Sequence, residues 1–281
     1  MRAIPVVLSV LLLLTACAPK PEPTSGGTSE RTVSVGGVDR TYRLYRPADV
    51  TDPAPLVVML HGGFGSGRQA EKSYGWNAEA DAGHFVVAYP DGLNRAWNTS
   101  GGCCGQPGRE GVDDVGFLTE LVKDVDREVP VDPARVYATG ISNGGIMSYT
   151  LACATDLFAA IGPDAATQLG DCAHPKPTSV IHLHGTDDPL VRYDGKRGAG
   201  VATIDGPPVE DLNARWRSVD RCAEPKVTNA GKVTRSVAGC PDGRAVELVT
   251  IDGGGHEWPD AAFHATHEIW TFFAAHPRAS G

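Results

Sequence analysis

The stretch Gly140-Ile141-Ser142-Asn143-Gly144 decides the fold of this chain. It follows an apolar run, Val136 to Thr139, and precedes a helix-compatible segment, Ile146 to Ala154. A serine on a tight turn between a strand and a helix is exposed to both a base and a substrate, and the flanking glycines leave room for the turn. The pentapeptide alone is a weak signal, but its context favours a nucleophile elbow with Ser142 as the nucleophile.

Short apolar runs on both sides of this stretch do not alternate with polar residues, which is typical of strands buried on both faces. They are Leu56 to Leu60, Phe85 to Tyr89, Arg135 to Thr139, Phe158 to Gly162, Val180 to His184 and Ala245 to Ile251. Helical patterns lie between several of them, the clearest from Val115 to Val129 behind the capping pair Asp113-Asp114. Alternating strands and helices predict an α/β fold with a mainly parallel sheet, helices on both faces and ligands at the carboxyl ends of the strands.

Two β-hairpins are predicted outside this pattern. Arg31 to Tyr45 alternates around Gly36-Gly37, and Lys226 to Arg235 contains a glycine turn.

An acid and a base follow later strands. Asp187 and Asp188 come after the strand that ends near Leu183, and His256 lies in a glycine-rich loop after the strand that ends at Ile251. We expect His256 to deprotonate Ser142 and then to protonate the leaving alcohol, while an aspartate fixes the imidazole tautomer. The order serine, aspartate, histidine is that of α/β hydrolases. Position alone does not choose between the two aspartates.

Three other histidines lie downstream, in or beside the last predicted helix, Thr266 to Ala275: His264, His267 and His276. A base that moves between two partners is better placed in a loop flanked by glycine, so we favour His256.

The oxyanion of a tetrahedral intermediate needs backbone N–H donors. We expect one from Asn143, the residue after the nucleophile, and the other from Gly63 or Phe64 in the loop His61 to Gly67. This loop lacks the Gly-Lys-Ser/Thr ending of a phosphate-binding loop and does not open a helix with G-x-G-x-x-G. No cofactor and no metal are expected.

The first sixteen residues predict an export signal. One positive charge, Arg2, precedes an apolar run from Ile4 to Leu14, which is too short to cross a bilayer but fits a signal peptide. The junction Leu14-Thr15-Ala16-Cys17 resembles the bacterial lipobox, so Cys17 is a candidate lipidation site; the alternative is a secretory signal with a cysteine nearby. Residues 17–30 are rich in Pro, Gly and Ser, which predicts a disordered tether.

Residues 31–281 have the length of a single α/β domain. The chain carries a formal net charge of −9, which argues against a nucleic acid or an anionic membrane surface as partner. We therefore expect one catalytic domain, exported and either held at the outer side of the cell membrane by a lipid anchor alone or extracellular. The oligomeric state is not indicated.

Six of the seven cysteines follow Cys17, and an even number in an exported chain favours disulfides. We expect bonds from Cys222 to Cys240 and from Cys153 to Cys172. Cys103 and Cys104 are then a vicinal pair or two free thiols. No cluster of histidines accompanies these adjacent cysteines to make a zinc site.

Several of these motifs occur together in one family. They are Leu60-His61-Gly62-Gly63, the segment Trp97 to Cys104, the segment Val112 to Phe117, the Ser142 elbow, His184-Gly185-Thr186-Asp187-Asp188 and the segment Gly255 to Pro259. In their order they resemble the polyhydroxybutyrate depolymerase and feruloyl esterase group of secreted α/β hydrolases, similar to carbohydrate esterase family 1 and including mycobacterial lipoprotein esterases. The resemblance covers Val33 to the C-terminus.

The family pattern His-Gly-Thr-x-Asp places the catalytic acid at its fifth residue, which selects Asp188. The resemblance implies an α/β-hydrolase fold and a serine esterase acting on hydroxyalkanoate or hydroxycinnamoyl esters. No appended polymer-binding module is visible, which puts the depolymerase name in doubt.

Trp97, Asn98 and Trp258 are candidates for the wall of the acyl or aryl pocket, since aromatic rings bury a large area; the alternative is that the tryptophans are structural. Two other functions compete with the esterase. One is a peptidase on the same fold. The short span of sequence between Ser142 and the acid disfavours a peptidase, because a lid domain is usually inserted in that span. The other is an inactive surface-binding lipoprotein, which would need a broken triad.

Overall fold

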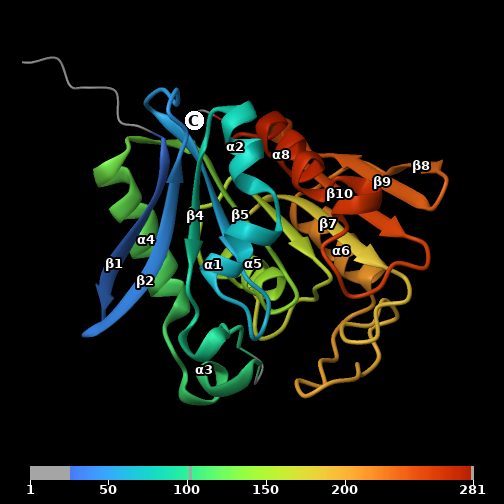
Figure 1. Ribbon diagram of the computed structural model, residues 1–281. Coiled ribbons are helices and arrows are strands. Elements are labelled where there is room, and N and C mark those ends of the chain that lie inside the picture. Colours follow the sequence, from blue (N-terminus) through green and yellow to red (C-terminus); the bar gives the residue numbers. More distant parts are fainter. Residues whose placement is uncertain (1–25, 101–102, 280–281) are drawn as a thin grey trace, which may run out of the picture.

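The computed structural model describes residues 26–100 and 103–279, which build a sheet covered by helices on both faces (Figure 1). The predicted export signal and Cys17 lie outside the described residues. The first described strand begins at Gly27, so the prediction of a tether over residues 17–30 is wrong for Gly27 to Glu30, which belong to the sheet. Among the described residues, no helix has the length and hydropathy that crossing a bilayer requires.

Ten strands form the sheet of the described residues. Their order is β1-β2-β4-β3-β5-β6-β7-β10-β9-β8. The central strands run parallel to one another: β4, β3, β5, β6, β7 and β10. The antiparallel pair β1-β2 flanks them on one side, and the antiparallel pair β9-β8 flanks them on the other. Their bounds are β1 Gly27–Val35, β2 Val38–Arg46, β3 Ala54–Leu60, β4 Val86–Pro90, β5 Val131–Ile141, β6 Ala160–Asp164, β7 Ser179–Gly185, β8 Lys226–Ala230, β9 Val233–Gly239 and β10 Ala245–Ile251. The predicted mainly parallel sheet is confirmed.

The helices are α1 Gly67–Ser73, α2 Trp76–Gly83, α3 Gly105–Glu110, α4 Asp114–Glu128, α5 Asn143–Ala154, α6 Val209–Val219, α7 Asp260–Phe263 and α8 Ala265–Ala275, with 3-10 turns at Leu93–Arg95 and Pro241–Gly243. Asp113 caps α4 as expected, because its carboxylate accepts the N–H of Gly116 at 2.7 Å.

The apolar runs of the central strands supply both faces of the sheet. In β3, Leu56, Val58 and Leu60 pack into one core with residues of α4, α5 and α6. The alternate residues Val57 and Met59 pack into a second core with residues of α1, α2 and α8. Successive side chains of a strand point to opposite faces. A strand between two helical layers must therefore be apolar at every position, as the sequence pattern indicated.

Both predicted hairpins are present. The turn between β1 and β2 is Gly36-Gly37, whose φ angles of 59° and 82° favour glycine. The second hairpin pairs β8 with β9.

Three disulfides join cysteines within residues 26–100 and 103–279, the part of the chain that the structure describes. Cys222 bonds to Cys240 and Cys153 to Cys172, the two pairings expected, and Cys103 bonds to Cys104. The first two join residues 18 and 19 positions apart. Closing a loop of this size contributes about 3 kcal/mol in the chain-entropy model.

One buried ion pair joins β2 to α4, and its removal is expected to destabilise the fold. Arg40 on β2 contacts Asp114 at 2.7 Å, and both side chains are at most 3% exposed. Arg40→Gln leaves the buried carboxylate without its counter-ion, which costs about 3–5 kcal/mol. Thermal or urea unfolding measures this loss. The matched control is Arg127→Gln, which breaks an exposed pair with Asp124 and is expected to cost about 0–1 kcal/mol; equal losses would contradict the assigned role of Arg40.

Candidate active site

The Ser142 turn has the geometry of a nucleophile elbow. Ser142 has φ 56° and ψ −123° between the end of β5 and the start of α5. A positive φ is strained for a residue with a side chain and persists where the surrounding structure holds it. Here the Ser142 N–H donates to the carbonyl of Asp164 at 2.9 Å, and the Ser142 carbonyl accepts the N–H of Ile146 at 2.8 Å.

The glycines around Ser142 are required by the neighbouring strand. A Cβ atom on Gly140 would lie 2.5 Å from the carbonyl oxygen of Leu60, and one on Gly144 would lie 2.2 Å from the same atom. Only glycine allows the elbow to approach β3 this closely, which is the physical reason for the Gly-x-Ser-x-Gly pattern.

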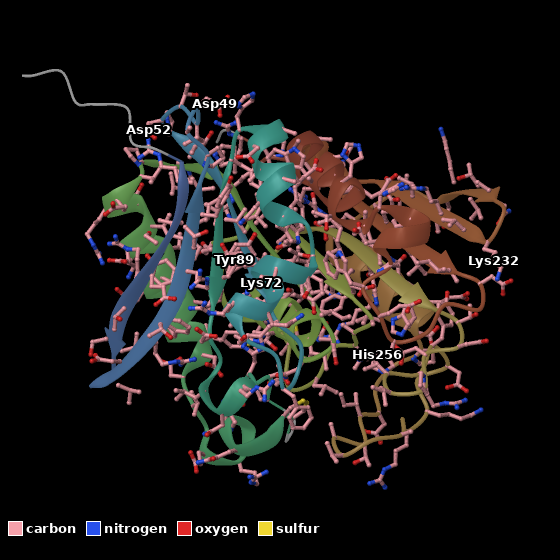
Figure 2. The ribbon with its side chains drawn as sticks, viewed as in Figure 1. Asp49, Asp52, Lys72, Tyr89, Lys232 and His256 are labelled. Carbon is pink, nitrogen blue, oxygen red and sulfur yellow. A yellow bond between two sulfur atoms is a disulfide. The ribbon has the colours of Figure 1, made fainter. Side chains whose placement is uncertain are left out.

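Asp188 and His256 meet in the loops that follow β7 and β10. The Nδ1 atom of His256 lies 2.8 Å from Oδ2 of Asp188, and Figure 2 places His256 beside the loops after β7. The other carboxylate oxygen accepts the backbone N–H groups of Leu190 and Val191 at 2.8 and 2.9 Å. Asp187 is exposed, whereas Asp188 is 3% exposed.

The electrostatics keep Asp188 ionised. Burial alone would raise the pKa of Asp188, but hydrogen bonds from His184 and His256 and the charge of His256 hold it well below its usual range. The neighbouring Asp164 behaves in the opposite way, because burial and then the negative charge of Asp188 raise its pKa well above the usual value. Of these two carboxyl groups, Asp188 therefore carries the negative charge.

A chain of buried side chains lies behind Asp188 and was not predicted. Tyr149 Oη lies 2.9 Å from His182 Nδ1, and His182 Nε2 lies 3.0 Å from His184 Nδ1. The Nε2 atom of His184 contacts the Val191 carbonyl at 2.7 Å and lies 3.5 Å from Asp188. Burial and the neighbouring His184 lower the pKa of His182 well below its usual value. The signal in the sequence was the pair of histidines two residues apart on one face of a buried strand.

The two expected oxyanion donors lie next to each other. Asn143 is the first residue of α5, so its N–H has no acceptor within the helix. A Cβ atom on Gly63 would lie 3.9 Å from the Cβ atom of Asn143. The N–H of Phe64 already donates to the Arg95 carbonyl at 2.8 Å, so Gly63 is the better candidate of the two alternatives.

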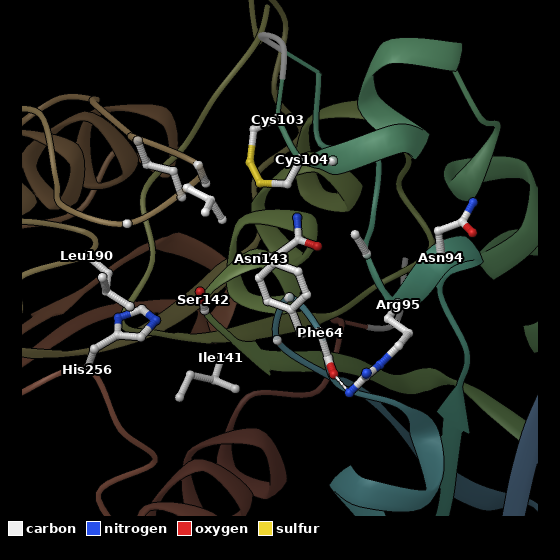
Figure 3. Close-up of a pocket in the computed structure, with 18 of the residues that line it drawn as sticks. Phe64, Asn94, Arg95, Cys103, Cys104, Ile141, Ser142, Asn143, Leu190 and His256 are labelled. Carbon is white, nitrogen blue, oxygen red and sulfur yellow. Dashed lines mark hydrogen bonds between the residues drawn. A yellow bond between two sulfur atoms is a disulfide. The ribbon is translucent and has the colours of Figure 1, made fainter.

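A cavity of about 720 Å³ opens in front of Ser142 (Figure 3). Both Ser142 and His256 line it, together with the Cys103–Cys104 disulfide. Three exposed apolar side chains also line it: Phe64, Leu190 and Val201, which are 68%, 36% and 84% exposed. Sequence reasoning did not find these wall residues, because they stand in loops without periodicity.

The three residues expected in the pocket wall do not line this cavity. Trp97 is fully buried. The backbone N–H of Asn98 donates a hydrogen bond to the carboxylate of Asp114 at the start of α4, and its side-chain amide donates to the Val112 carbonyl just before that helix. Trp258 packs on Tyr74 with ring centroids 5.0 Å apart, and Tyr74 itself reaches the cavity. The expectation was wrong because each of these side chains finds a partner within the protein.

Metal ligands are not grouped in the described residues: no cluster of three or more His, Cys, Asp or Glu side chains there is arranged to hold an ion.

Comparison with known proteins defines the class: the chain has the α/β-hydrolase fold and belongs to a family of esterases. A solved acetyl xylan esterase from Aspergillus awamori superposes with a TM-score of 0.66 at 15% identity, over 88% of this chain and 99% of that one. The family described as esterase PHB depolymerase matches residues 40–206, more than half of the sequence. The chain therefore belongs to that family, and the resemblance noted in the sequence is confirmed.

Two relatives are similar to most of this chain. The putative esterase NocK of Nocardia uniformis subsp. tsuyamanensis is 33% identical over 264 residues, which cover 84% of this chain and 75% of the relative. Feruloyl esterase B of Piromyces equi is 33% identical over 221 residues, or 72% of this chain. The match spans only 39% of the length of the Piromyces protein.

Proposed function

We propose that this protein is a serine carboxylic-ester hydrolase that works through an acyl-enzyme intermediate formed on Ser142. The observation that carries the proposal is the convergence of a strained elbow serine, a histidine held at 2.8 Å by a buried carboxylate and two adjacent backbone donors on one cavity. Membership of an esterase family supports the same chemistry.

The mechanism assigns one step to each group. Asp188 holds Nδ1 of His256, so Nε2 takes the proton of Ser142 Oγ as the oxygen attacks the ester carbonyl. The resulting oxyanion accepts hydrogen bonds from the N–H groups of Asn143 and Gly63. When the intermediate collapses, His256 gives its proton to the leaving alcohol. Water, deprotonated by the same histidine, then hydrolyses the acyl-enzyme and frees Ser142.

The cavity wall suggests the kind of ester. Phe64, Leu190 and Val201 provide exposed apolar surface beside Ser142, which suits an acyl group with a substantial hydrocarbon or aromatic part. Hydroxyalkanoate and hydroxycinnamoyl esters both meet this description, and several relatives carry the name feruloyl esterase.

The protein acts outside the cytoplasm in this proposal. The leader 1–16 directs export, and lipidation of Cys17 anchors the domain at the outer side of the membrane through the residues that follow. Three disulfides are consistent with an oxidising compartment.

Hydrolysis of an ester panel by the purified protein tests the proposal. The panel contains p-nitrophenyl esters of increasing acyl length, methyl ferulate and hydroxybutyrate oligomers, and Ser142→Ala provides the blank. We expect turnover that depends on Ser142 and rises from acetyl to longer or aromatic acyl groups. A folded protein inert on every ester would overturn the proposal in favour of a peptidase or a binding protein, which peptide substrates then separate.

A further inference from the structure

Trp97 lies between the two segments that carry the expected oxyanion donors. Its side chain is fully buried and is absent from the cavity lining, so it is not placed to touch a substrate. Its peptide group nevertheless contacts the residue after the nucleophile, and its indole contacts the glycine loop after β3.

The contact with the first segment is a two-point clasp. The Trp97 N–H donates to Oδ1 of Asn143 at 2.7 Å, and Nδ2 of Asn143 donates back to the Trp97 carbonyl at 3.1 Å. The same carbonyl accepts the N–H of Cys104 at 3.1 Å. The clasp therefore fixes the side chain of Asn143 to a peptide group that the disulfide segment also holds.

The contact with the second segment comes from the indole. Its Nε1–H donates to the carbonyl of His61 at 2.9 Å, and the two rings lie 4.8 Å apart. His61 immediately precedes Gly62 and Gly63, and its Nε2 atom accepts the N–H of Gly92 at 3.0 Å. The position of the Gly63 donor thus depends on the same tryptophan as the position of Asn143.

We propose that Trp97 is a positioning residue that sets the spacing between the Asn143 and Gly63 donors. This inference rests on the proposed function, since it concerns the oxyanion of that reaction. Donors stabilise an oxyanion only when they lie about 2.7–3.1 Å from its position, and misplacement by about 1 Å can cost about 100-fold in rate. The donors come from segments about 80 residues apart in the sequence, so a rigid buried link between them has a direct effect on the transition state.

Trp97→Phe tests the proposal, because it keeps an aromatic ring beside His61 and removes the N–H donor. We expect kcat on a p-nitrophenyl ester to fall about 10- to 100-fold while KM stays within about twofold. Affinity for an alkyl boronic acid, whose serine adduct carries the oxyanion, is expected to fall by a similar factor.

Trp216→Phe is the matched control. Trp216 on α6 is also fully buried, and its indole donates to Gln168 at 3.1 Å, away from the cavity lining. We expect this variant to lose thermal stability as Trp97→Phe does and to keep the kcat of the wild type. If the two variants lose stability alike and both keep kcat, Trp97 is merely structural and the proposal is overturned; a rise in KM alone overturns it as well.

Asn143→Ala provides a second route if Trp97→Phe fails to fold. It retains the backbone donor and removes the clasp, so kcat and boronic acid affinity are expected to fall together. Unchanged values would reject the proposal. Failure of the proposed function itself looks different, because the wild-type protein would then hydrolyse no ester.

Discussion

Ser142→Ala is expected to lower kcat on every hydrolysed ester by about 10⁴- to 10⁶-fold, because it removes the atom that forms the acyl-enzyme. The oxyanion donors and the cavity remain, so the rate left above the uncatalysed reaction measures their separate contribution. Initial rates with p-nitrophenyl esters, combined with the absence of a burst of p-nitrophenol, measure the effect. Circular dichroism and thermal unfolding are expected to match those of the wild type.

Ser148→Ala is a matched control for this variant. Ser148 lies on α5, the helix that starts at the elbow, and is fully buried. Its hydroxyl donates a hydrogen bond to the carbonyl of Gly144 at 3.1 Å. We expect its kcat to stay within about threefold of the wild type. If Ser142→Ala kept a rate within tenfold of the wild type, another nucleophile would carry the reaction and the proposed mechanism would be wrong.

The central part of the fold could be predicted because its constraints are local in the sequence. A strand covered by helices on both faces has no side chain in contact with water, so it is apolar throughout. The uninterrupted apolar run Leu56 to Leu60 indicates such a strand. The elbow glycines could be recognised because the carbonyl of Leu60 excludes a Cβ at Gly140 and Gly144. The start of the domain at Gly27 could not be predicted from the sequence, because β1 is an exposed edge strand and its polar first residues resemble those of a disordered tether.

The candidate site could be predicted from the sequence only where a motif indicated its residues. Asp187 and Asp188 differ in their surroundings in the folded chain: Asp187 is exposed, whereas Asp188 is buried and its carboxylate accepts the N–H groups of Leu190 and Val191. Trp97 was expected in the cavity because it is large and aromatic. Its indole instead donates to a backbone carbonyl, a partner that no sequence pattern indicates.

Asp188→Asn is expected to lower kcat by about 10⁴-fold, whereas Asp187→Asn is expected to change it less than about threefold. An amide at position 188 presents the wrong group to Nδ1 of His256, so the histidine is held in the tautomer that cannot accept the Ser142 proton. Asp187 is exposed, and its backbone N–H donates to the Gly254 carbonyl, a contact that the amide variant retains. Equal losses in the two variants would contradict the choice of Asp188.

The loss of stability in Asp188→Asn is expected to depend on pH. Because hydrogen bonds from His184 and His256 hold the pKa of Asp188 below its unfolded-state value, ionised Asp188 contributes stability that is complete above about pH 4. That contribution is lost as the pH falls toward the folded-state pKa. Thermal unfolding should therefore show Asp188→Asn less stable than the wild type at pH 7, with a smaller gap at pH 3. A gap that stays constant with pH would mean that the charge of the Asp188 carboxylate does not stabilise the folded state.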